Sequence, residues 1–560
     1  MATLHNRPTA VTRHITDGHR PPNDPGSGEG GGGEFDTIVV GGGHNGLTCA
    51  AYLARAGQRV VVLESLPTAG GYCTSETTVT EAPGFLMNTG GIDHIFTNIA
   101  PSVVDELRLS RHGLRYVDVD PLASYLGPGG ECLPLWRDLD RACAEIARFS
   151  PRDATRYREF VSVLADAVDV LIPYLMGHPK RVRPRDLLKV LRRAAHHRRS
   201  LVPAVRILAS PATAVLDEWF ETEEIKSAII AYTSFTTTPI DSPGLGLALI
   251  PVQHRWGLRR PVGGSGAFTR ALVEAIRAHG GEVRTGTAVR EVTVRDGRAR
   301  AVVLESGETL RAGQIVGALD PVTLLTKLVD PTQLPATTRA ELDGLQVGGH
   351  NLGAFKVDVA LRGRPVWPRH GGGDHAVVAQ AMLTNIAEVK AATRQAMSGE
   401  LPENPPVTLW TPSVFDRELV PEGSGGDSLY LYPIATPLKL SGGRDWQAEK
   451  HRYLERCLDV VERYAPGTRD LIIGTNIRCP EDFPSHNGNI YHVDMLLSQM
   501  GPWRPTPSLS GYRTPIDGLW HTAAGAHPVG GLSGWSGRTT ARTLLRAGAA
   551  QRSRRRAVAG

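Results

Sequence analysis

The sequence predicts an α/β fold, in which a Rossmann-type dinucleotide-binding domain is combined with a discontinuous α+β substrate domain. Three observations lead to this prediction. A buried apolar strand runs into a glycine-rich turn and a helix just after Phe35. A second strand, glycine-rich turn and helix follow between Ser510 and Arg538. The chain has 560 residues, which is too long for one ordinary core and indicates at least two lobes.

The first ordered unit has the order strand, helix, strand. Residues 36–40 form an apolar run that is typical of a buried parallel strand. A helix is expected from about Gly46 to Ala56, and a second strand follows over residues 59–64. This order is the opening of a doubly wound fold.

The turn between the first strand and the helix has the spacing Gly-x-Gly-x-x-Gly at Gly41, Gly43 and Gly46. The first glycine permits a tight turn, the second lets the backbone approach a pyrophosphate, and the third lets helix and strand pack closely. The helix N-terminus favours the negative charge of the pyrophosphate. Glu64 ends the second strand where a carboxylate would accept from both ribose hydroxyls and repel a 2′-phosphate.

Two further features favour FAD over NAD as the dinucleotide. Gly70 and Gly71 follow Glu64 closely and offer a second backbone approach to the pyrophosphate. The glycine-rich turn within residues 510–538 offers backbone amides to another part of the ligand, the flavin ring or the ribityl chain. The chain has no second strand-associated Gly-x-Gly-x-x-Gly, so we expect no separate nicotinamide domain.

Changes in composition along the chain predict its domain organisation. Residues 1–34 end in a run of glycines, which predicts a disordered tail. The middle, from about Pro151 to Tyr232, carries mostly helical patterns, and Asp296-Gly297 between two alternating runs predicts a β-hairpin. We expect a discontinuous FAD-binding domain at 35–125, 261–330 and 505–548, a substrate-binding domain at 126–260 and 331–504, and a second disordered tail at 549–560.

Composition and charge exclude several other classes of protein. The formal net charge is +5 and no nucleic-acid motif or basic-aromatic stripe occurs, so we expect no nucleic-acid partner. The six cysteines form no Cys-x-x-Cys pair, so we expect neither a redox dithiol nor a metal site. No secretory signal and no apolar run of about 20 residues occurs, which predicts a cytoplasmic protein, at most peripheral to a membrane.

Six motifs together carry a resemblance to a known family. They are residues 40–47, Leu63-Glu64 with Gly70-Gly71, residues 80–85, 488–492, 510–513 and 525–528. In this combination the chain resembles the phytoene desaturase-like flavoproteins, whose FAD-binding domain is of the amine oxidase/phytoene desaturase type. Within them it is most similar to the branch of pyridine nucleotide-disulphide oxidoreductase domain-containing protein 2. The resemblance extends from Phe35 to about Leu545.

This resemblance implies a non-covalent FAD, held by the N-terminal motif, the strand at Val289 and the C-terminal helix. Despite the family's name, no redox disulfide motif is present. The chain departs from the family pattern at Pro528-Val-Gly530, which could alter the shape of the site near the flavin. The FAD-binding residues implied are Gly41, Gly43, His44, Asn45, Gly46, Glu64, Gly70, Gly71, Val289, Gly525, Gly531 and Leu532.

The substrates of the superfamily are long, apolar and conjugated, and they include polyene tetramate macrolactams that bacterial enzymes reductively cyclise. The resemblance therefore implies an enzyme that desaturates, isomerises or reductively cyclises a bulky hydrophobic polyene in bacterial secondary or isoprenoid metabolism. A cyclase would use NADPH as a transient reductant. Two alternatives stay open, a flavin amine oxidase and a non-catalytic FAD-binding scaffold.

Catalytic residues are difficult to choose, because an apolar substrate tunnel needs no charged side chains. Each candidate also has a structural interpretation as a packed or hydrogen-bonding residue. The acid–base candidates are His94, Tyr232 and His527, and the candidates for lining the substrate cavity are His254, Trp256 and Trp535.

Two charged stretches indicate surface features. Lys356 and Asp358 share one face of an alternating strand, which we interpret as its solvated face. Residues 180–199 place leucines at helical spacing, with arginines elsewhere around the helix. This segment fits a basic solvated helix, a contact with an anionic membrane, or a docking site for an acidic carrier protein.

Overall fold

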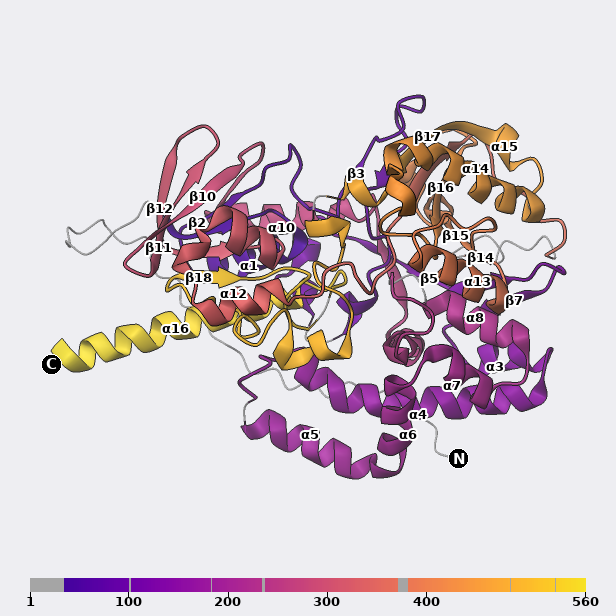
Figure 1. The fold of residues 1–560 in the computed structure, drawn as a ribbon, viewed down its shortest axis with the longest axis horizontal. Helices are drawn as coiled ribbons and strands as arrows, with labels where there is room; N and C mark the ends of the chain where they lie inside the picture. Colours follow the sequence, from indigo (N-terminus) through magenta and orange to yellow (C-terminus); the bar gives the residue numbers. More distant parts are fainter. Residues whose placement is uncertain are drawn as a thin grey trace. The chain divides into compact units, whose positions relative to one another are not determined.

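A seven-stranded sheet forms the centre of the dinucleotide-binding part of the computed structural model (Figure 1). Its strands follow the order β10-β11-β12-β1-β2-β9, and β18 pairs with β12. The inner strand β1 is parallel to both neighbours, with Ile38 opposite Ile315 on one side and Val61 on the other. The bounds are β1 (Phe35–Val40), β2 (Val60–Leu63), β9 (Glu282–Arg284), β10 (Val289–Arg295), β11 (Arg298–Leu304), β12 (Thr309–Gly317) and β18 (Leu519–His521).

The structure describes residues 35–99, 102–182, 184–233, 237–370, 381–483, 485–528 and 530–559. They belong to one compact unit, Gly33–Gly560. The tail predicted over residues 1–34 lies outside the described residues, as do Val529 and Gly560.

The apolar run that predicts β1 is continuous because this strand is buried on both faces. Val39 joins the core that contains α1, whereas Ile38 and Val40 join a separate core on the other face of the sheet. The hairpin predicted at Asp296-Gly297 is also confirmed, because this pair joins β10 to β11. The two residues have φ values of 51° and 68°, as a two-residue type I′ turn requires.

Three helices pack beside this sheet: α1 (His44–Arg55), α10 (Gly266–Ala278) and α16 (Trp535–Ala559). The last of them crosses the first at unusually short range. A Cβ on Gly537 would lie 2.0 Å from the Asn45 backbone oxygen, and one on Gly534 would lie 2.7 Å from Thr48 Oγ1. Glycine is therefore required on α16, and just before it, where α1 approaches.

The disordered tail predicted at 549–560 is wrong up to Ala559, because α16 continues to that residue. Residues 549–559 contain several Ala and Arg residues and neither Gly nor Pro. Alanine and arginine have high helix propensity, so the helix can continue beyond the part that packs on α1.

The second sheet also has seven strands, in the order β17-β13-β16-β15-β14-β6-β7. Its pairs are antiparallel except for β14 and β6, which are parallel. Helix α14 (Trp446–Tyr464) packs on one face, over Val357, Leu429 and Leu431. The bounds are β6 (Ala123–Leu126), β7 (Cys132–Leu135), β13 (Lys356–Leu361), β14 (Ala381–Leu383), β15 (Val407–Trp410), β16 (Asp427–Pro433) and β17 (Ile472–Arg478). The predicted domain boundary at 125/126 falls inside β6, and the domain boundaries stay predictions.

The segment before the second glycine-rich boundary is helical, as the patterns from about Pro151 to Tyr232 predict. Helix α4 begins after the N-cap Ser150, whose side chain accepts from Asp153 N. Helices α5 and α6 both pack against α4 (Figure 1). The bounds are α3 (Leu139–Ala147), α4 (Pro151–Leu175), α5 (Pro184–His196), α6 (Arg198–Ala209), α7 (Ala212–Trp219), α8 (Glu223–Thr233) and α9 (Leu249–Trp256).

Shorter elements connect these parts. Two small antiparallel pairs are β3–β4 and β5–β8. Their bounds, with those of the remaining helices, are β3 (Ser75–Glu76), β4 (Met87–Asn88), β5 (Tyr116–Val119), β8 (Leu258–Pro261), α2 (Val103–Glu106), α11 (Pro321–Thr323), α12 (Ala336–Asp343), α13 (Ile386–Met397) and α15 (Thr468–Leu471).

Lys356 and Asp358 are buried, so the interpretation of a solvated strand face is wrong. Both residues are 1% exposed, because β13 is an inner strand with β16 on one side and β17 on the other. The Lys356 ammonium pairs with the Asp358 carboxylate, which also accepts from Thr78 Oγ1 at 2.9 Å. Alternation does not distinguish a polar face in water from a polar face that meets a second lobe.

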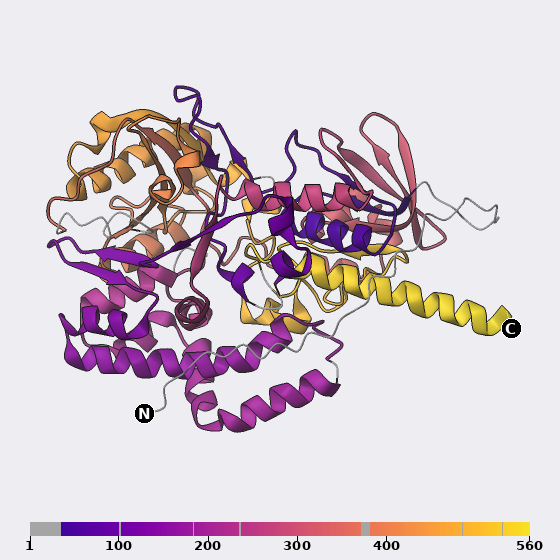
Figure 2. The same cartoon turned by 180° about the vertical axis from the view of Figure 1, so that it is seen from behind.

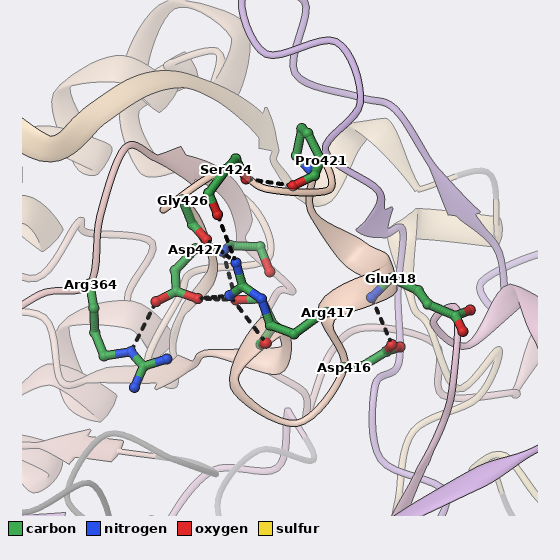
Figure 3. A network of polar contacts seen from close by, with 10 residues as sticks. Arg364, Asp416, Arg417, Glu418, Pro421, Ser424, Gly426 and Asp427 are labelled. Atoms are coloured by element: carbon green, nitrogen blue, oxygen red, sulfur yellow. Dashed lines mark hydrogen bonds and ion pairs between the residues drawn. The ribbon is translucent and has the colours of Figure 1, made fainter.

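An ion-pair network fixes the loop between β15 and β16 (Figure 3). The Asp427 carboxylate accepts from Arg417 Nη1 at 2.6 Å and from Arg364 Nε at 3.0 Å. In the same loop, Asp416 Oδ2 accepts from Gly263 N at 2.6 Å. The loop therefore connects the second sheet to the glycine-rich segment that precedes α10.

The substitution Gly537→Ala tests the helix crossing. The added Cβ would lie 2.0 Å from a backbone oxygen, so α1 and α16 must separate, and we expect a loss of about 1–3 kcal/mol of unfolding free energy. Urea denaturation measures this unfolding free energy. Gly548→Ala on the same helix is the matched control, because its Cβ would meet only Arg552 Nη1 at 3.6 Å, and alanine there should stabilise by up to about 1 kcal/mol. Equal stability of the two variants would contradict the observed packing.

Candidate functional site

The glycine-rich turn after β1 combines tight packing with open space. Gly41 has φ = 101°, and a Cβ there would lie 2.9 Å from Ala318 O. A Cβ on Gly46 would lie 2.3 Å from Gly41 O, so only glycine lets α1 approach the strand. A Cβ on Gly43, in contrast, would meet nothing within 4 Å. The backbone at Gly43 is thus the part of the turn that a ligand can approach.

The N-terminus of α1 lies at this open space. Gly43 is the N-cap, no side chain caps the helix, and the first turn contains no acidic residue. Uncapped amides and the helix dipole favour a phosphate at this position. Gly70 forms a parallel bridge with Gly43, and a Cβ on Gly71 would lie 3.2 Å from Gly43 Cα. The structure therefore brings both glycine pairs to one place.

Glu64 presents a buried carboxylate to the same turn. Its Oε2 accepts from Gly42 N at 2.7 Å and its Oε1 accepts from Leu66 N at 2.9 Å. Among the described residues, neither Lys nor Arg pairs with it, so lone pairs remain for the hydroxyls of a ribose. Thr287 N donates to Glu64 O at 2.7 Å, which brings the start of β10, at Val289, beside it.

The C-terminal glycine-rich turn packs onto the same helix terminus. Nε2 of His44 lies 3.2 Å from Gly531 O. Burial lowers the pKa of His44 to about 4, so its ring is neutral at pH 7. A Cβ on Gly531 would lie 3.0 Å from the Phe96 ring, and one on Gly91 would lie 3.0 Å from Leu532 Cδ1. The turn therefore joins the N-terminal motif to the segment that contains Phe96.

Two buried nitrogens without hydrogen-bond partners lie near the C-terminal glycine-rich turn. Gly525 approaches His492, because a Cβ on the glycine would lie 3.1 Å from His492 Cβ. His492 Nδ1 and Trp535 Nε1 are buried and have no hydrogen-bond partner among the described residues. Such groups are rare in folded proteins unless a ligand or water satisfies them. With the open turn and the Glu64 carboxylate, they fit an FAD held by both glycine-rich turns. Val529, at the departure from the family pattern, lies outside the described residues.

His94 is a buried hydrogen-bonding residue. Its Nδ1 lies 3.1 Å from Tyr116 Oη and its Nε2 lies 3.3 Å from Ser265 Oγ. Its ring packs edge-on against Phe268 at 5.4 Å. Burial holds the pKa of His94 well below the ordinary value, so the ring is neutral at pH 7. Through these contacts His94 holds the segment before η1 (Ile95–Asn98) against α10.

The candidates from α8 and α9 lie in different surroundings. Tyr232 is buried, and its hydroxyl has no hydrogen-bond partner within the described ranges. His254 uses both ring nitrogens, one 2.9 Å from Tyr157 Oη and the other 2.9 Å from Arg137 O. Trp256 is half-buried beneath the Arg255 guanidinium. Tyr232 alone of the three combines burial with a free polar group.

His527 and Trp535 lie at the C-terminal turn, as the sequence predicts. His527 is fully buried, its Nε2 lies 3.4 Å from Tyr174 O, and its ring lies 5.3 Å from that of Tyr174. Trp535 is the first residue of α16, and its ring lies 5.6 Å from that of Phe96. Trp535 therefore borders the segment that Gly531 contacts, whereas His527 contacts the end of α4.

Sequence reasoning missed an aromatic and charged face of the second sheet. Trp410 on β15 lies 5.1 Å from the ring of Tyr430 and 6.3 Å from that of Tyr432 on β16. Lys356 Nζ lies 4.7 Å from the centre of the Tyr430 ring. Burial lowers the pKa of the Lys356 ammonium, and Asp358 opposes this shift. The period-two alternation of tyrosine and leucine in β16 was the signal that could have revealed this face.

This face lies opposite α14 and meets the FAD-binding part. Trp410 Nε1 donates to Asp93 Oδ2 at 3.1 Å, and Asp93 also pairs with Arg260 at 2.7 Å. Arg478 Nη1 on β17 donates to Thr89 O at 3.2 Å. The aromatic face is thus held against the segment that leads to His94 and Phe96. The region between the C-terminal turn and this face is the candidate substrate side of the site.

Comparison with known proteins agrees with this geometry. The family described as flavin containing amine oxidoreductase matches residues 46–396. The chain is 29% identical to pyridine nucleotide-disulfide oxidoreductase domain-containing protein 2 of Rattus norvegicus, over 97% of each chain. It is 25% identical to a limonene dehydrogenase subunit of Castellaniella defragrans, over 91% of this chain and 94% of that one. It is also 25% identical to the neurosporene-forming phytoene desaturase of Cereibacter sphaeroides, over 89% and 92%.

Solved structures confirm the predicted fold class. An oxidoreductase from Methanosarcina mazei superposes with a TM-score of 0.58 at 17% identity, over 91% of this chain and 99% of that one. Putrescine oxidase bound to putrescine superposes with a TM-score of 0.58 at 16% identity, over 92% and 99%. At these identities the likeness concerns the fold alone, an FAD-binding α/β domain with a second, mixed sheet.

Gly43→Asp tests the dinucleotide site. The position is open and has an ordinary φ of −65°, so the variant should fold, but its carboxylate would repel the pyrophosphate and prevent flavin binding. Flavin absorbance per chain measures flavin binding, and the melting temperature measures whether the variant folds. Gly425→Asp is the matched control, because that glycine is also open and lies in the loop before β16. A Gly43→Asp protein that keeps full flavin content would refute the assignment.

The buried histidines predict a loss of stability in mild acid. Burial lowers the pKa of His44, His492, His521 and His527 from 6.5 to about 4. Between these values the unfolded chain binds more protons than the folded one, so stability falls as pH falls from about 6.5 to about 4. Each pKa unit corresponds to about 1.4 kcal/mol. The melting temperature should fall across this window, and His521→Gln should reduce the slope. A melting temperature that is constant across the window would contradict the burial of neutral rings.

Proposed function

The chain belongs to the family of flavin-containing amine oxidoreductases, and from this membership we propose that it is an FAD-dependent oxidoreductase that alters double bonds in a bulky hydrophobic molecule. The observation that carries this proposal is the aromatic face formed by Trp410, Tyr430 and Tyr432. Trp410 and Tyr432 are each 6% exposed, and the face is held against the FAD-binding part. An apolar, conjugated substrate gains both area burial and ring stacking on such a face.

The neutral histidines of the site support a reaction on an uncharged, apolar substrate. The rings of His44, His94 and His527 are neutral at pH 7, because burial lowers their pKa values. When bound, FAD supplies the hydride chemistry. The chain's own residues then hold the cofactor at Gly43 and Glu64, exclude water, and position the substrate against the aromatic face.

The names of two relatives narrow the class of substrate. The limonene dehydrogenase and the phytoene desaturase are named for isoprenoid hydrocarbons without charged groups. We therefore place an isoprenoid or other polyene first, with desaturation, isomerisation and reductive cyclisation as the reactions to separate. Reduction by NADPH would favour cyclisation, and secondary metabolism would then be its setting.

A flavin amine oxidase is the second candidate. Tyr430 and Tyr432 lie 6.5 Å apart with an interplanar angle of 33°, and such a pair of rings can bind an amine between them. Arg478 lies on the same side of the sheet and would repel a protonated amine, whereas the charge of Lys356 is balanced by Asp358. The guanidinium of Arg478 therefore places the hydrocarbon ahead of the amine. A flavin-bearing scaffold without activity predicts that neither class of compound reduces the flavin.

Anaerobic flavin reduction tests the proposal. The purified protein would be mixed with limonene or phytoene dispersed in detergent, and in parallel with putrescine or cyclohexylamine, while flavin absorbance is followed. We expect bleaching by a hydrocarbon, or bleaching by NADPH if the reaction is reductive. Bleaching by the amines alone would replace the proposal with the amine oxidase.

Tyr432→Leu locates the reaction on the aromatic face. We expect the rate of bleaching to fall by about fivefold, because one aromatic contact of about 1 kcal/mol is lost. Tyr464→Leu is the matched control, since Tyr464 is equally buried but lies on α14, on the other side of the sheet. Equal rates for the two variants would remove the aromatic face from the substrate site.

A further inference from the structure

Helix α5 exposes an apolar face. Leu187, Leu188 and Leu191 lie on one side of the helix and are 47%, 57% and 56% exposed. No residue of α5 is buried, although its sequence is strongly amphipathic. An amphipathic helix in a globular protein normally turns its apolar face to the core. The leucines of α5 therefore require another explanation than coverage of the core.

The basic residues of α5 lie beside a cavity but stay accessible to water. Arg185, Lys189 and Arg193 follow each other at intervals of one helical turn and line a cavity of about 430 Å³ between α4, α5 and α16. Arg193 Nη1 also donates to Asp169 O on α4 at 2.6 Å. The side chain of Lys189 is nevertheless 64% exposed, and Arg185 is also exposed, so these cations can meet a ligand from solution.

The next helix adds to the exposed apolar surface. Val202 and Val205 on α6 are 77% and 63% exposed, whereas Ala204 and Ile207 on the same helix are buried. In both views α5 lies on the side of α4 that is away from the two sheets (Figures 1 and 2). The leucines of α5 and these valines, together called the α5–α6 apolar surface, are thus not covered by the rest of the described chain.

The charges around this surface indicate what covers it. Among the described residues of the segment 180–206, Asp186 is the single carboxylate. A second copy of the chain would bring two such basic segments together, which repulsion opposes. A partner surface with an apolar interior and negative charge at its boundary would bury the leucines and neutralise the cations. The cations are Lys180, Arg181, Arg185, Lys189, Arg192, Arg193, Arg198 and Arg199, whereas Arg206 is already paired with Glu218 at 2.7 Å.

We propose that the α5–α6 apolar surface docks this protein on a bilayer that contains anionic phospholipids. The leucines and valines enter the boundary of the acyl chains, and the basic residues beside them bind lipid phosphates. No helix within the described ranges is long and apolar enough to cross a membrane. In this proposal the protein lies on the surface of the bilayer. The proposal goes beyond the proposed reaction and does not depend on it.

Sedimentation with vesicles tests the proposal on the full-length, flavin-loaded protein. Vesicles of phosphatidylcholine alone are compared with vesicles of phosphatidylcholine and phosphatidylglycerol, at low and high salt. We expect binding to the anionic vesicles that weakens with salt. The variant Leu187→Ser/Leu188→Ser/Leu191→Ser should lose at least about tenfold in the partition coefficient, because three exposed side chains lose their apolar contact with lipid. Flavin content and melting temperature should not change, since none of the three is buried.

Leu66→Ser is the matched control, because Leu66 is 50% exposed like the leucines of α5 but follows β2 in the other part of the chain. It should bind vesicles like the wild type. Arg192→Gln/Arg198→Gln/Arg199→Gln should reduce the difference between anionic and neutral vesicles. A wild-type protein that binds neither vesicle would overturn the proposal. So would self-association in gel filtration that the leucine variant abolishes, because the surface would then belong to a second copy.

Discussion

The packing of α16 against α1 is the contact on which the rest of the site depends. These two helices are separated by most of the chain, yet Gly537 lies against the backbone of Asn45 at a distance that no Cβ could occupy. The contact is reinforced by Arg538 on α16, whose guanidinium pairs at 2.7 Å with Glu106 on α2, and Tyr52 of α1 donates to the same carboxylate. Because α16 begins directly after the second glycine-rich turn, this packing places that turn over the N-terminus of α1. Two motifs at opposite ends of the sequence thereby lie together at one candidate site.

Burial then determines the electrostatics of the region. The histidines around the two turns lie away from water, so each is held in its neutral form, and the Glu64 carboxylate is held by backbone amides. The paired charge of Lys356 and Asp358 lies on the second sheet, beside the aromatic face. A site with neutral rings, open amides and edge-to-face aromatics binds and orients well but has little capacity for acid–base work at neutral pH. This balance fits a protein that leaves the bond-changing chemistry to its cofactor.

Short sequence patterns correctly predicted the features that depend only on backbone geometry and on the periodicity of apolar residues. The spacing of Gly41, Gly43 and Gly46, the buried strand β1 and the Asp296-Gly297 hairpin each follow from backbone sterics and periodicity. The burial of Lys356 and the tie of His254 to Tyr157 follow instead from which lobe lies against which strand face. Tertiary packing decides which surfaces meet. Neither the alternating pattern of one strand nor a single histidine in the sequence predicts that packing. The flavin-binding residues and the domain boundaries stay predictions, although the geometry of both glycine turns suits the ligand.

The assignment of FAD is tested by the visible absorption spectrum of the purified protein, with the released cofactor identified by mass. We expect a yellow protein with a flavin spectrum and a released compound with the mass of FAD. We also expect that protein stripped of cofactor regains this spectrum when FAD is added. A folded protein that is colourless as purified and takes up no FAD would refute the assignment, because the open turn at Gly43 would then require a different ligand.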